Sequence, residues 1–346
     1  SVKKYGYLSR LEEQLDLAGT AHVLFDKILP NPVKEHVMEG AALARENGCD
    51  FVIGLGGGSS IDSSKAIAVM ATNDGDYWDY ISGGKGKEVL AKPLPVVAIT
   101  TTAGTGTEAD PFAVVTNGQE KIGFGCDDTF PVLAVVDPEL MVSIPPHLTA
   151  YQGFDALFHS TEGYINKTAN EISDLFALRA IELIGRSLAK AVANGSDSDA
   201  RADVALANTL AGMVESTSGC ISEHSMEHAM SAYHHKLPHG AGLIMISREY
   251  YTFMANAKAC DERLIAMAKA LGFKDAKDPM DFVKALTDLQ KACGVDQLKM
   301  SDYGITLEEL PQMAANAKET MGGLFEGDPV LVSEEAVTEI YRRSYR

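Results

Sequence analysis

The chain of 346 residues is short of cysteine, of basic residues and of long apolar runs, and each shortage excludes a class of protein. Its five cysteines are scattered, odd in number and never spaced Cys-x-x-Cys, which argues against a disulfide framework and against a thiolate zinc site. We therefore expect a reduced, cytoplasmic protein. No apolar run approaches the roughly 18 residues of a membrane span, so we expect no membrane partner.

The deficit of positive charge excludes another class of partner. Lys plus Arg number 30 against 48 Asp plus Glu, which gives a formal net charge of −18. A nucleic-acid-binding surface must be basic to neutralise phosphates, so we predict no nucleic-acid partner. A hydrophobic fraction of 46% and a charged fraction of 23% exclude a disordered chain. The length favours two domains.

Helix and strand patterns alternate in the first part of the chain. Amphipathic segments cover residues 8–19, 33–44 and 59–70. Short apolar runs that predict buried strands cover residues 21–25, 51–53, 95–99, 112–115 and 132–136. Strands separated by helices predict parallel βαβ units, and solid apolar runs are typical of strands covered on both faces. Because such a sheet normally begins with a strand, we expect a further strand ahead of Ser1.

The pattern changes at the prolines of Ser143-Ile144-Pro145-Pro146, which interrupt regular structure. Beyond them long helical patterns dominate, for example over residues 172–191, 200–215 and 261–271. We therefore predict an α/β domain over residues 1–144 and an all-α domain over residues 145–346.

A glycine triplet stands between the predicted strand at 51–53 and the next helix. Gly56, Gly57 and Gly58 let the backbone approach a phosphate without interference from Cβ atoms. The helix N-terminus offers unpaired N–H groups and the positive end of the dipole, and we expect Ser59 and Ser60 to cap it. A plain tight turn is the alternative, because the spacing is not Gly-x-Gly-x-x-Gly. The strand–turn–helix context favours a phosphate site.

A second polar loop, Thr100–Glu108, follows the predicted strand at 95–99. Hydroxyl residues and glycines at the carboxyl end of a parallel strand lie where α/β proteins bind ligands. The alternative is a polar loop built from Ser/Thr turns, and the residues alone leave both interpretations open.

Carboxylate and imidazole side chains recur at helical spacing in the second domain. Asp155 and His159 are four residues apart, His224 and His228 repeat the interval, and His239 follows. Residues four apart share a helix face, so each pair can reach one ion, although a single pair is more often a solvated face. An aspartate with three histidines suits Fe²⁺, Zn²⁺ or a similar divalent cation. The spacing differs from the His-Glu-x-x-His pattern of metalloproteases.

Together these motifs resemble the iron-containing (group III) alcohol dehydrogenase family, and within it the butanol-dehydrogenase-like branch. The similarity runs from Ser1 to Arg346 and is carried by Gly56-Gly57-Gly58-Ser59, Thr101-Thr102-Ala103-Gly104-Thr105, Gly153-Phe154-Asp155-Ala156-Leu157-Phe158-His159 and His224-x-x-x-His228 with Pro238-His239-Gly240. The resemblance implies a Rossmann-like N-terminal domain, a helical C-terminal domain of the dehydroquinate synthase-like architecture, and a cofactor and metal in the cleft between them. It also implies a homo-oligomer, with a dimer or a larger assembly as the family expectation.

The resemblance further implies an NAD or NADP cofactor and a set of residues that contact it. These are Gly57, Gly58 and Ser59 at the pyrophosphate, Thr101, Thr102 and Thr105 along the adenosine and phosphates, and Lys121, which matches a lysine that reaches the cofactor. NADP is common in the butanol-dehydrogenase-like branch, and Lys3 and Lys4 are candidates to pair with its 2′-phosphate.

The metal and the chemistry follow from the same resemblance. The implied ligands of Fe²⁺ or Zn²⁺ are Asp155, His159, His224 and His239, and His228 matches a histidine assigned to proton relay near the nicotinamide. The implied reaction is reversible hydride transfer between the cofactor and a primary alcohol or aldehyde, with the metal as Lewis acid. Glu162, one turn beyond His159, is either a partner of a ligating imidazole or an exposed helix carboxylate.

Three other functions remain open. A sugar-phosphate lyase or cyclase of the dehydroquinate-synthase type needs several basic residues for phosphate and carboxylate, and residues 224–248 offer only Lys236 and Arg248. Oxidation of polyols, as in glycerol dehydrogenases, is a second alternative, and a non-catalytic metal- or nucleotide-binding protein is a third. Assays with an aldehyde and each nicotinamide cofactor separate them.

Overall fold

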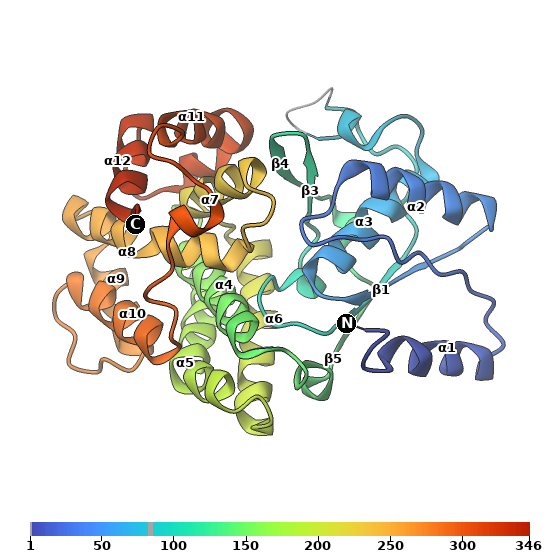
Figure 1. Cartoon of the computed structure of the whole chain (residues 1–346), viewed down its shortest axis with the longest axis horizontal. Helices are drawn as coiled ribbons and strands as arrows, with labels where there is room; N and C mark the ends of the chain where they lie inside the picture. The colour runs from blue at the N-terminus through green and yellow to red at the C-terminus, as the bar shows by residue number, and fades with distance from the viewer. Residues whose placement is uncertain (1, 82–85) are drawn as a thin grey trace. The chain divides into compact units, whose positions relative to one another are not determined.

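The computed structural model describes residues 2–81 and 86–346 and divides the chain into two compact units (Figure 1). The N-terminal unit comprises the residues up to Thr102, Thr107–Gly118 and Ile122–Ser143. The helical unit comprises Ile144–Arg346 and two short segments of the earlier chain, Ala103–Gly106 and Gln119–Lys121.

The N-terminal unit contains both helices and strands, but they alternate only around the glycine turn: two helices precede the first strand, and among the described residues no α-helix separates the last four strands. Its helices are α1 (Tyr7–Leu17), α2 (Lys34–Glu46) and α3 (Gly58–Thr72). Its strands are β1 (Val52–Gly56), β2 (Val96–Thr100), β3 (Ala113–Asn117), β4 (Glu120–Phe124) and β5 (Leu133–Val136). Short 3₁₀ turns occupy Tyr77–Asp79, Thr107–Ala109, Asp127–Thr129 and Pro138–Met141.

Strands β1, β2 and β5 form a parallel sheet in that order. Gly56 pairs with Thr100, and Thr100 pairs with Val136, so the carboxyl ends of all three strands lie level at one edge. The glycine turn and the threonine loop leave the sheet from this edge, where the backbone N–H of Thr101 donates to the carbonyl oxygen of Gly56 at 2.8 Å.

Helix α3 connects β1 to β2 and is buried on nearly every face, which explains its many small residues. It packs against α2, and a Cβ atom on Gly40 of α2 would lie 2.9 Å from Cγ1 of Ile67. The glycine therefore permits the close approach of the two helices. Their apolar side chains, with Tyr77 and Val115, form the core of this unit.

Two strand predictions differ from the structure. Residues 21–25 form no strand, and most of their side chains are exposed, because no neighbouring strand in the described residues pairs with them. The run at 112–115 is a strand, β3, but it pairs with β4 in a separate two-stranded sheet and not with the parallel set. The sequence pattern did not predict β4, because its polar residues Glu120 and Lys121 interrupt the apolar run.

The helical unit confirms the predicted helices at 172–191, 200–215 and 261–271. Its helices are α4 (Pro146–Ile165), α5 (Glu171–Ala193), α6 (Ser198–Thr217), α7 (Ser222–Tyr233), α8 (His239–Ala257), α9 (Asp261–Ala270), α10 (Met280–Ala292), α11 (Leu310–Met321) and α12 (Glu334–Ser344). Two 3₁₀ segments cover Met300–Tyr303 and Gly322–Gly327. Among the described residues no helix has the length and apolar character needed to cross a membrane.

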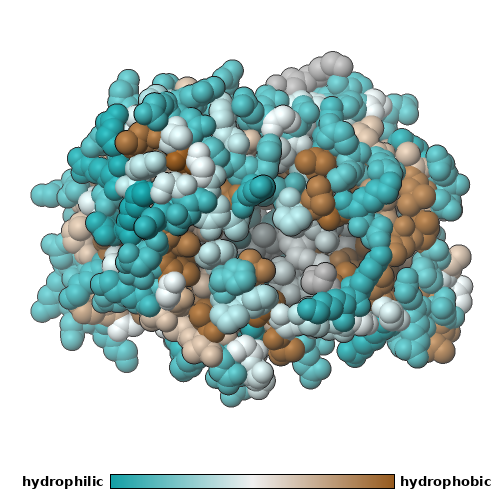
Figure 2. All heavy atoms as spheres, in the orientation of Figure 1, coloured by the Kyte–Doolittle hydropathy of each residue, from teal (hydrophilic) through white to brown (hydrophobic). Residues whose placement is uncertain are grey.

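On the face drawn in Figure 2 hydrophilic side chains predominate, and hydrophobic ones occur in small scattered groups. Scattered exposed apolar side chains are ordinary on folded proteins. The chemistry-bearing residues are, by contrast, mostly buried on α4, α7 and the start of α8.

Candidate metal centre

Four side chains that the sequence singles out converge inside the helical unit. Asp155 and His159 come from α4, His224 from α7, and His239 is the first residue of α8. The Oδ1 atom of Asp155 lies 3.3 Å from Nε2 of His159, 3.6 Å from Nε2 of His224 and 3.4 Å from Nε2 of His239. One carboxylate oxygen thus lies within 3.6 Å of an Nε2 atom from each of three imidazoles.

Local packing explains the convergence. The spacing of four puts Asp155 and His159 on one face of α4, which is buried along most of its length. A Cβ atom on Gly240 would overlap the carbonyl oxygen of Tyr151 and lie 2.7 Å from its carbonyl carbon. Gly240 therefore lets the first turn of α8 touch the backbone of α4, and this contact brings His239 beside Asp155.

Two overlapping groups of side chains are each close enough together to hold a divalent cation, Asp155 with His224 and His239, and His159 with His224 and Cys220. Donor atoms of a tetrahedral site with bonds of about 2.0–2.1 Å are about 3.3–3.4 Å apart, close to the separations around Asp155 Oδ1. Within the described residues, buried Asp155 Oδ1 and His224 Nε2 have no hydrogen-bond partner. An unpartnered buried polar atom costs about 1–3 kcal/mol, and an ion at this point satisfies both atoms.

Each imidazole whose Nε2 faces Asp155 has a partner at its other nitrogen. His224 Nδ1 pairs with Oε1 of Glu162, and His239 Nδ1 pairs with Oε2 of Glu227. Such partners fix the ring orientation and the tautomer of ligating histidines. Glu162 is therefore a buried partner of an imidazole, as one of the two sequence interpretations held, although it faces His224 and not His159.

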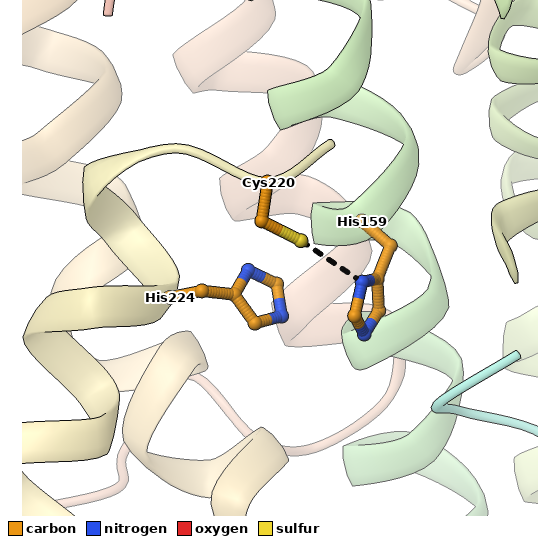
Figure 3. A group of neighbouring side chains, drawn as sticks. All are labelled: His159, Cys220 and His224. Carbon is orange, nitrogen blue, oxygen red and sulfur yellow. Dashed lines mark hydrogen bonds between the residues drawn. The ribbon is translucent and has the colours of Figure 1, made fainter. Parts of the chain in front are cut away.

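The third imidazole has two partners. His159 Nδ1 lies 3.2 Å from Sγ of Cys220 and 3.2 Å from Oε2 of Glu215. Figure 3 shows the sulfur of Cys220 directed toward the ring of His159, with His224 beside them. Cys220 follows the turn between α6 and α7, and Glu215 lies in the last turn of α6.

The charge distribution favours a cation. Burial opposes ionisation of Asp155, but the facing imidazoles, His239 before His159, hold the pKa of its carboxyl well below the usual range. Burial opposes protonation of His159 and His224, yet Cys220 and Glu215 raise the pKa of the former, and Glu162 and Asp155 raise that of the latter. The carboxylates among these groups, Glu215, Glu162 and Asp155, stabilise positive charge where the donors meet.

His228 lies beside this group without joining the ring of donors around Asp155. Its ring centroid is 5.3 Å from that of His239, and its Nδ1 is 2.9 Å from the sulfur of Met321. Burial, reinforced by the charge of Lys121, lowers its pKa well below the usual value. These surroundings favour the neutral form of His228.

Lys121 lies against the side chains of Glu227 and His239. Its Nζ donates to Oγ of Ser231 at 2.8 Å and lies 3.3 Å from Oε2 of Glu227 and 3.4 Å from Nδ1 of His239. The lysine belongs to Gln119–Lys121, one of the segments that pack with the helical unit. Contact between Lys121 and a cofactor stays a prediction.

The predicted phosphate loop has the geometry of a close backbone approach. Helix α3 begins at Gly58, and its cap residue is Gly57, so the prediction that Ser59 and Ser60 cap the helix is wrong. A Cβ atom on Gly57 would lie 2.8 Å from Cγ2 and 3.0 Å from Oγ1 of Thr102. The glycine turn and the start of the threonine loop are therefore in contact within the N-terminal unit.

Thr105 lies in the segment Ala103–Gly106, which packs with the helical unit. The backbone N–H of Gly106 donates to Oδ1 of Asn208 at 2.8 Å, and a Cβ atom on Gly212 would lie 2.7 Å from the carbonyl carbon of Gly106. Helix α6 thus holds this part of the loop through one side chain and one glycine.

Sequence reasoning missed three partners of the imidazoles. Glu227 immediately precedes His228, and its place one turn after His224 was an available signal. Glu215 and Cys220 lie outside any recognisable spacing, because only the turn between α6 and α7 brings them to His159. The burial of Glu227 and Cys220 was not visible in the sequence.

Comparison with known proteins identifies the relatives. The family model described as iron-containing alcohol dehydrogenase matches residues 1–138, and the model of the C-terminal part of the Fe-containing alcohol dehydrogenase family matches residues 149–345. The chain is 33% identical to alcohol dehydrogenase 4 of Saccharomyces cerevisiae (strain YJM789), over 99% of this chain and 88% of that protein. It is 34% identical to the NAD-dependent methanol dehydrogenase of Bacillus methanolicus, over 98% and 88%.

A solved structure agrees with these matches. The archaeal halo-thermophilic alcohol dehydrogenase ADH/D1 from a Red Sea brine pool, in the form bound to NZQ, superposes with a TM-score of 0.95 at 36% identity, over 99% of this chain and 89% of that one. The two family models cover most of the sequence, and the predicted fold class is confirmed. This chain belongs to the iron-containing alcohol dehydrogenase family.

Proposed function

We propose that this chain interconverts primary alcohols and aldehydes with NAD or NADP at a divalent metal held by Asp155, His159, His224 and His239. As a member of its family it is an oxidoreductase that acts on CH–OH groups. The observation that carries the metal assignment is the convergence of three Nε2 atoms on one oxygen of Asp155, at 3.3–3.6 Å. Fe²⁺ and Zn²⁺ both accept this mixed oxygen and nitrogen set.

The proposed site residues have different roles in metal binding and catalysis. A divalent ion bound at these donors supplies a Lewis acid that polarises a carbonyl oxygen, and the nicotinamide supplies the hydride chemistry. Asp155 contributes the negative charge of the donor set, and the imidazoles contribute neutral donors. Glu162 and Glu227 hold two of those imidazoles with Nε2 toward Asp155. Burial of the donors limits the access of water to the reacting carbon.

His228 is the proposed proton relay. Because its Nδ1 faces the sulfur of Met321, its Nε2 is the nitrogen left to exchange a proton with the reacting oxygen or with a water. The neutral form, favoured by burial and by Lys121, accepts a proton during alcohol oxidation. The protonated form returns it during aldehyde reduction.

The dinucleotide is proposed to bind at the carboxyl edge of the parallel sheet. Gly57 and Gly58 expose backbone N–H groups at the start of α3, and the positive end of the helix dipole favours the pyrophosphate. Ser59 adds a hydroxyl group in the first turn. Thr101, Thr102 and Thr105 are proposed to line the adenosine and phosphate side, with Lys121 nearer the reacting end.

The proposal also includes an oligomeric state and a cellular location. A homo-oligomer, with a dimer as the simplest form, is supported by the resemblance to the family. A cytoplasmic location is supported by five cysteines that the structure leaves as free thiols.

The test is a steady-state assay with butanal and each reduced cofactor, on protein loaded with Fe²⁺ or Zn²⁺. His239→Ala is expected to lose the metal and the activity. The variant should still bind the dinucleotide, because His239 lies outside the predicted phosphate loop. If this variant reduces aldehydes at the parent rate, the metal assignment fails. Turnover of a phosphorylated sugar acid, without net consumption of NADH or NADPH by any aldehyde, would favour a lyase or cyclase.

A further inference from the structure

We propose that Glu227, paired with Lys121, is a positioning residue that sets the orientation of His239 at the metal centre. The inference rests on the metal site proposed above and adds two residues that act through a ligand. Glu227 accepts a hydrogen bond from Nδ1 of His239 with the same oxygen, Oε2, that lies 3.3 Å from Nζ of Lys121.

His239 depends more on such support than the other ligands do. Its side chain is 20% exposed, whereas those of Asp155, His159 and His224 are 5–7% exposed. It is also the first residue of α8, preceded by the cap residue Pro238, so helical backbone supports it on one side only. Fewer packing contacts leave a side chain freer to rotate, and a hydrogen bond at Nδ1 restricts that rotation.

The surroundings of Glu227 are shaped for this role. The side chain is 0% exposed on α7, and a Cβ atom on Gly242 of α8 would lie 2.7 Å from its Cγ and 2.8 Å from its Oε1. Only a residue without a side chain at position 242 leaves room for the carboxylate beside the first turns of α8. The same two helices carry His224 and His239, so the carboxylate lies between elements that both bear ligands.

Lys121 supplies the charge that the buried carboxylate needs. A buried anion without a partner costs several kcal/mol, and the ammonium group, itself 5% exposed, offsets that cost. Its bond to Oγ of Ser231 fixes the ammonium group from a second direction. Lys121 thus acts on the metal site by holding the carboxylate of Glu227 in place.

The experiment measures Zn²⁺ affinity of metal-free full-length protein by competition with a chromophoric chelator. The variants are Glu227→Leu and the isosteric Glu227→Gln, with Asp328→Asn as the matched control. Asp328 is another fully buried carboxylate of the helical unit, but its partners are Ser222 and Tyr250. Loss of a partner that orients a ligating histidine lowers metal affinity about 10–100-fold, which we expect for Glu227→Leu. Glu227→Gln, which keeps a neutral acceptor, is expected to lose less, and Asp328→Asn less than about threefold.

Two further readouts separate positioning from general destabilisation. The visible absorption of the Co²⁺-substituted protein should change in Glu227→Gln and stay unchanged in Asp328→Asn, because ring orientation alters the ligand field. Lys121→Met should weaken Zn²⁺ binding in the parent and add no further loss in the Glu227→Leu background, because the lysine acts through the glutamate.

The outcomes are distinct. Parent-like affinity in Glu227→Leu, an equal loss in Asp328→Asn, or an unchanged Co²⁺ spectrum in Glu227→Gln overturns the proposal. A Lys121→Met effect of the same size with and without Glu227 overturns the role of the lysine. If the parent binds no Zn²⁺, or Asp155→Asn binds it as the parent does, the proposed metal site itself fails.

Discussion

Removal of the metal is expected to lower the melting temperature of the helical unit, and replacement of Asp155 is expected to reduce this difference. The four donors come from three helices, so an ion that binds them stabilises only the folded arrangement. At a free-metal concentration of roughly one thousand times Kd, binding to the folded state alone contributes about 4 kcal/mol. For a unit of roughly 200 residues, each kcal/mol shifts the melting temperature by about 2–4 °C. The expected rise on metal addition is therefore about 8–16 °C.

Asp155→Asn removes the one anionic donor while it conserves the shape of the side chain. Each tenfold loss of affinity removes about 1.4 kcal/mol. A hundredfold loss would therefore reduce the stabilisation to about 1.4 kcal/mol, a rise of about 3–6 °C. The assay is differential scanning calorimetry of chelator-treated protein with and without Zn²⁺, with Asp328→Asn as the control that should keep the full rise. Equal melting temperatures of the parent with and without metal, or a full rise in Asp155→Asn, would refute the reasoning.

Three other predictions concern separate parts of the chain. His228→Ala should lower kcat about 100-fold or more and flatten its pH profile while the bound metal is retained; an unchanged pH–rate curve would contradict the relay. Gly212→Ala should destabilise the protein by about 1–3 kcal/mol and weaken dinucleotide binding, because the added methyl group would meet the backbone of Gly106. The control is Gly322→Ala, since a Cβ atom at Gly322 has open space. Parent-like binding and melting in Gly212→Ala would contradict this prediction. Burial raises the pKa of Asp62 from 3.8 to about 6, so the folded state holds this proton more tightly than the unfolded chain does. The protonated Asp62 should therefore stabilise the fold below about pH 4, and this contribution should decline by about 3 kcal/mol as the pH rises through 6. The free energy of unfolding of Asp62→Asn, measured in urea, should lack this decline. The same pH dependence in the parent and the variant would reject the prediction.

Periodicity and turn residues predicted the elements that carry the candidate site. Asp155 and His159 lie on one helix as their spacing requires, and the glycine triplet does connect a strand to a helix. The motifs in combination also indicated the family, which the family models confirm. Local pattern suffices here because each motif lies within one element or at one turn.

Pairing and burial depend on residues far apart in the chain, and there the sequence was less informative. The run at 21–25 has a strand composition but no partner strand among the described residues, and β3 has a partner that hydrophobicity did not reveal. The acceptors Glu215, Glu227 and Cys220 are ordinary residues until folding brings them to the imidazoles. No spacing rule indicated that Lys121 would lie against them.

The position of Lys121 has a consequence for dissecting this enzyme. The lysine precedes the helical sequence by more than twenty residues, yet its ammonium group neutralises a carboxylate enclosed by α7 and α8. A fragment begun at Pro145 would retain every proposed ligand and still carry an uncompensated anion in its interior. A chimera joined at Pro145 would need a lysine at the equivalent of position 121 in the protein that supplies its first part. The two parts of the sequence therefore cannot be exchanged freely between relatives.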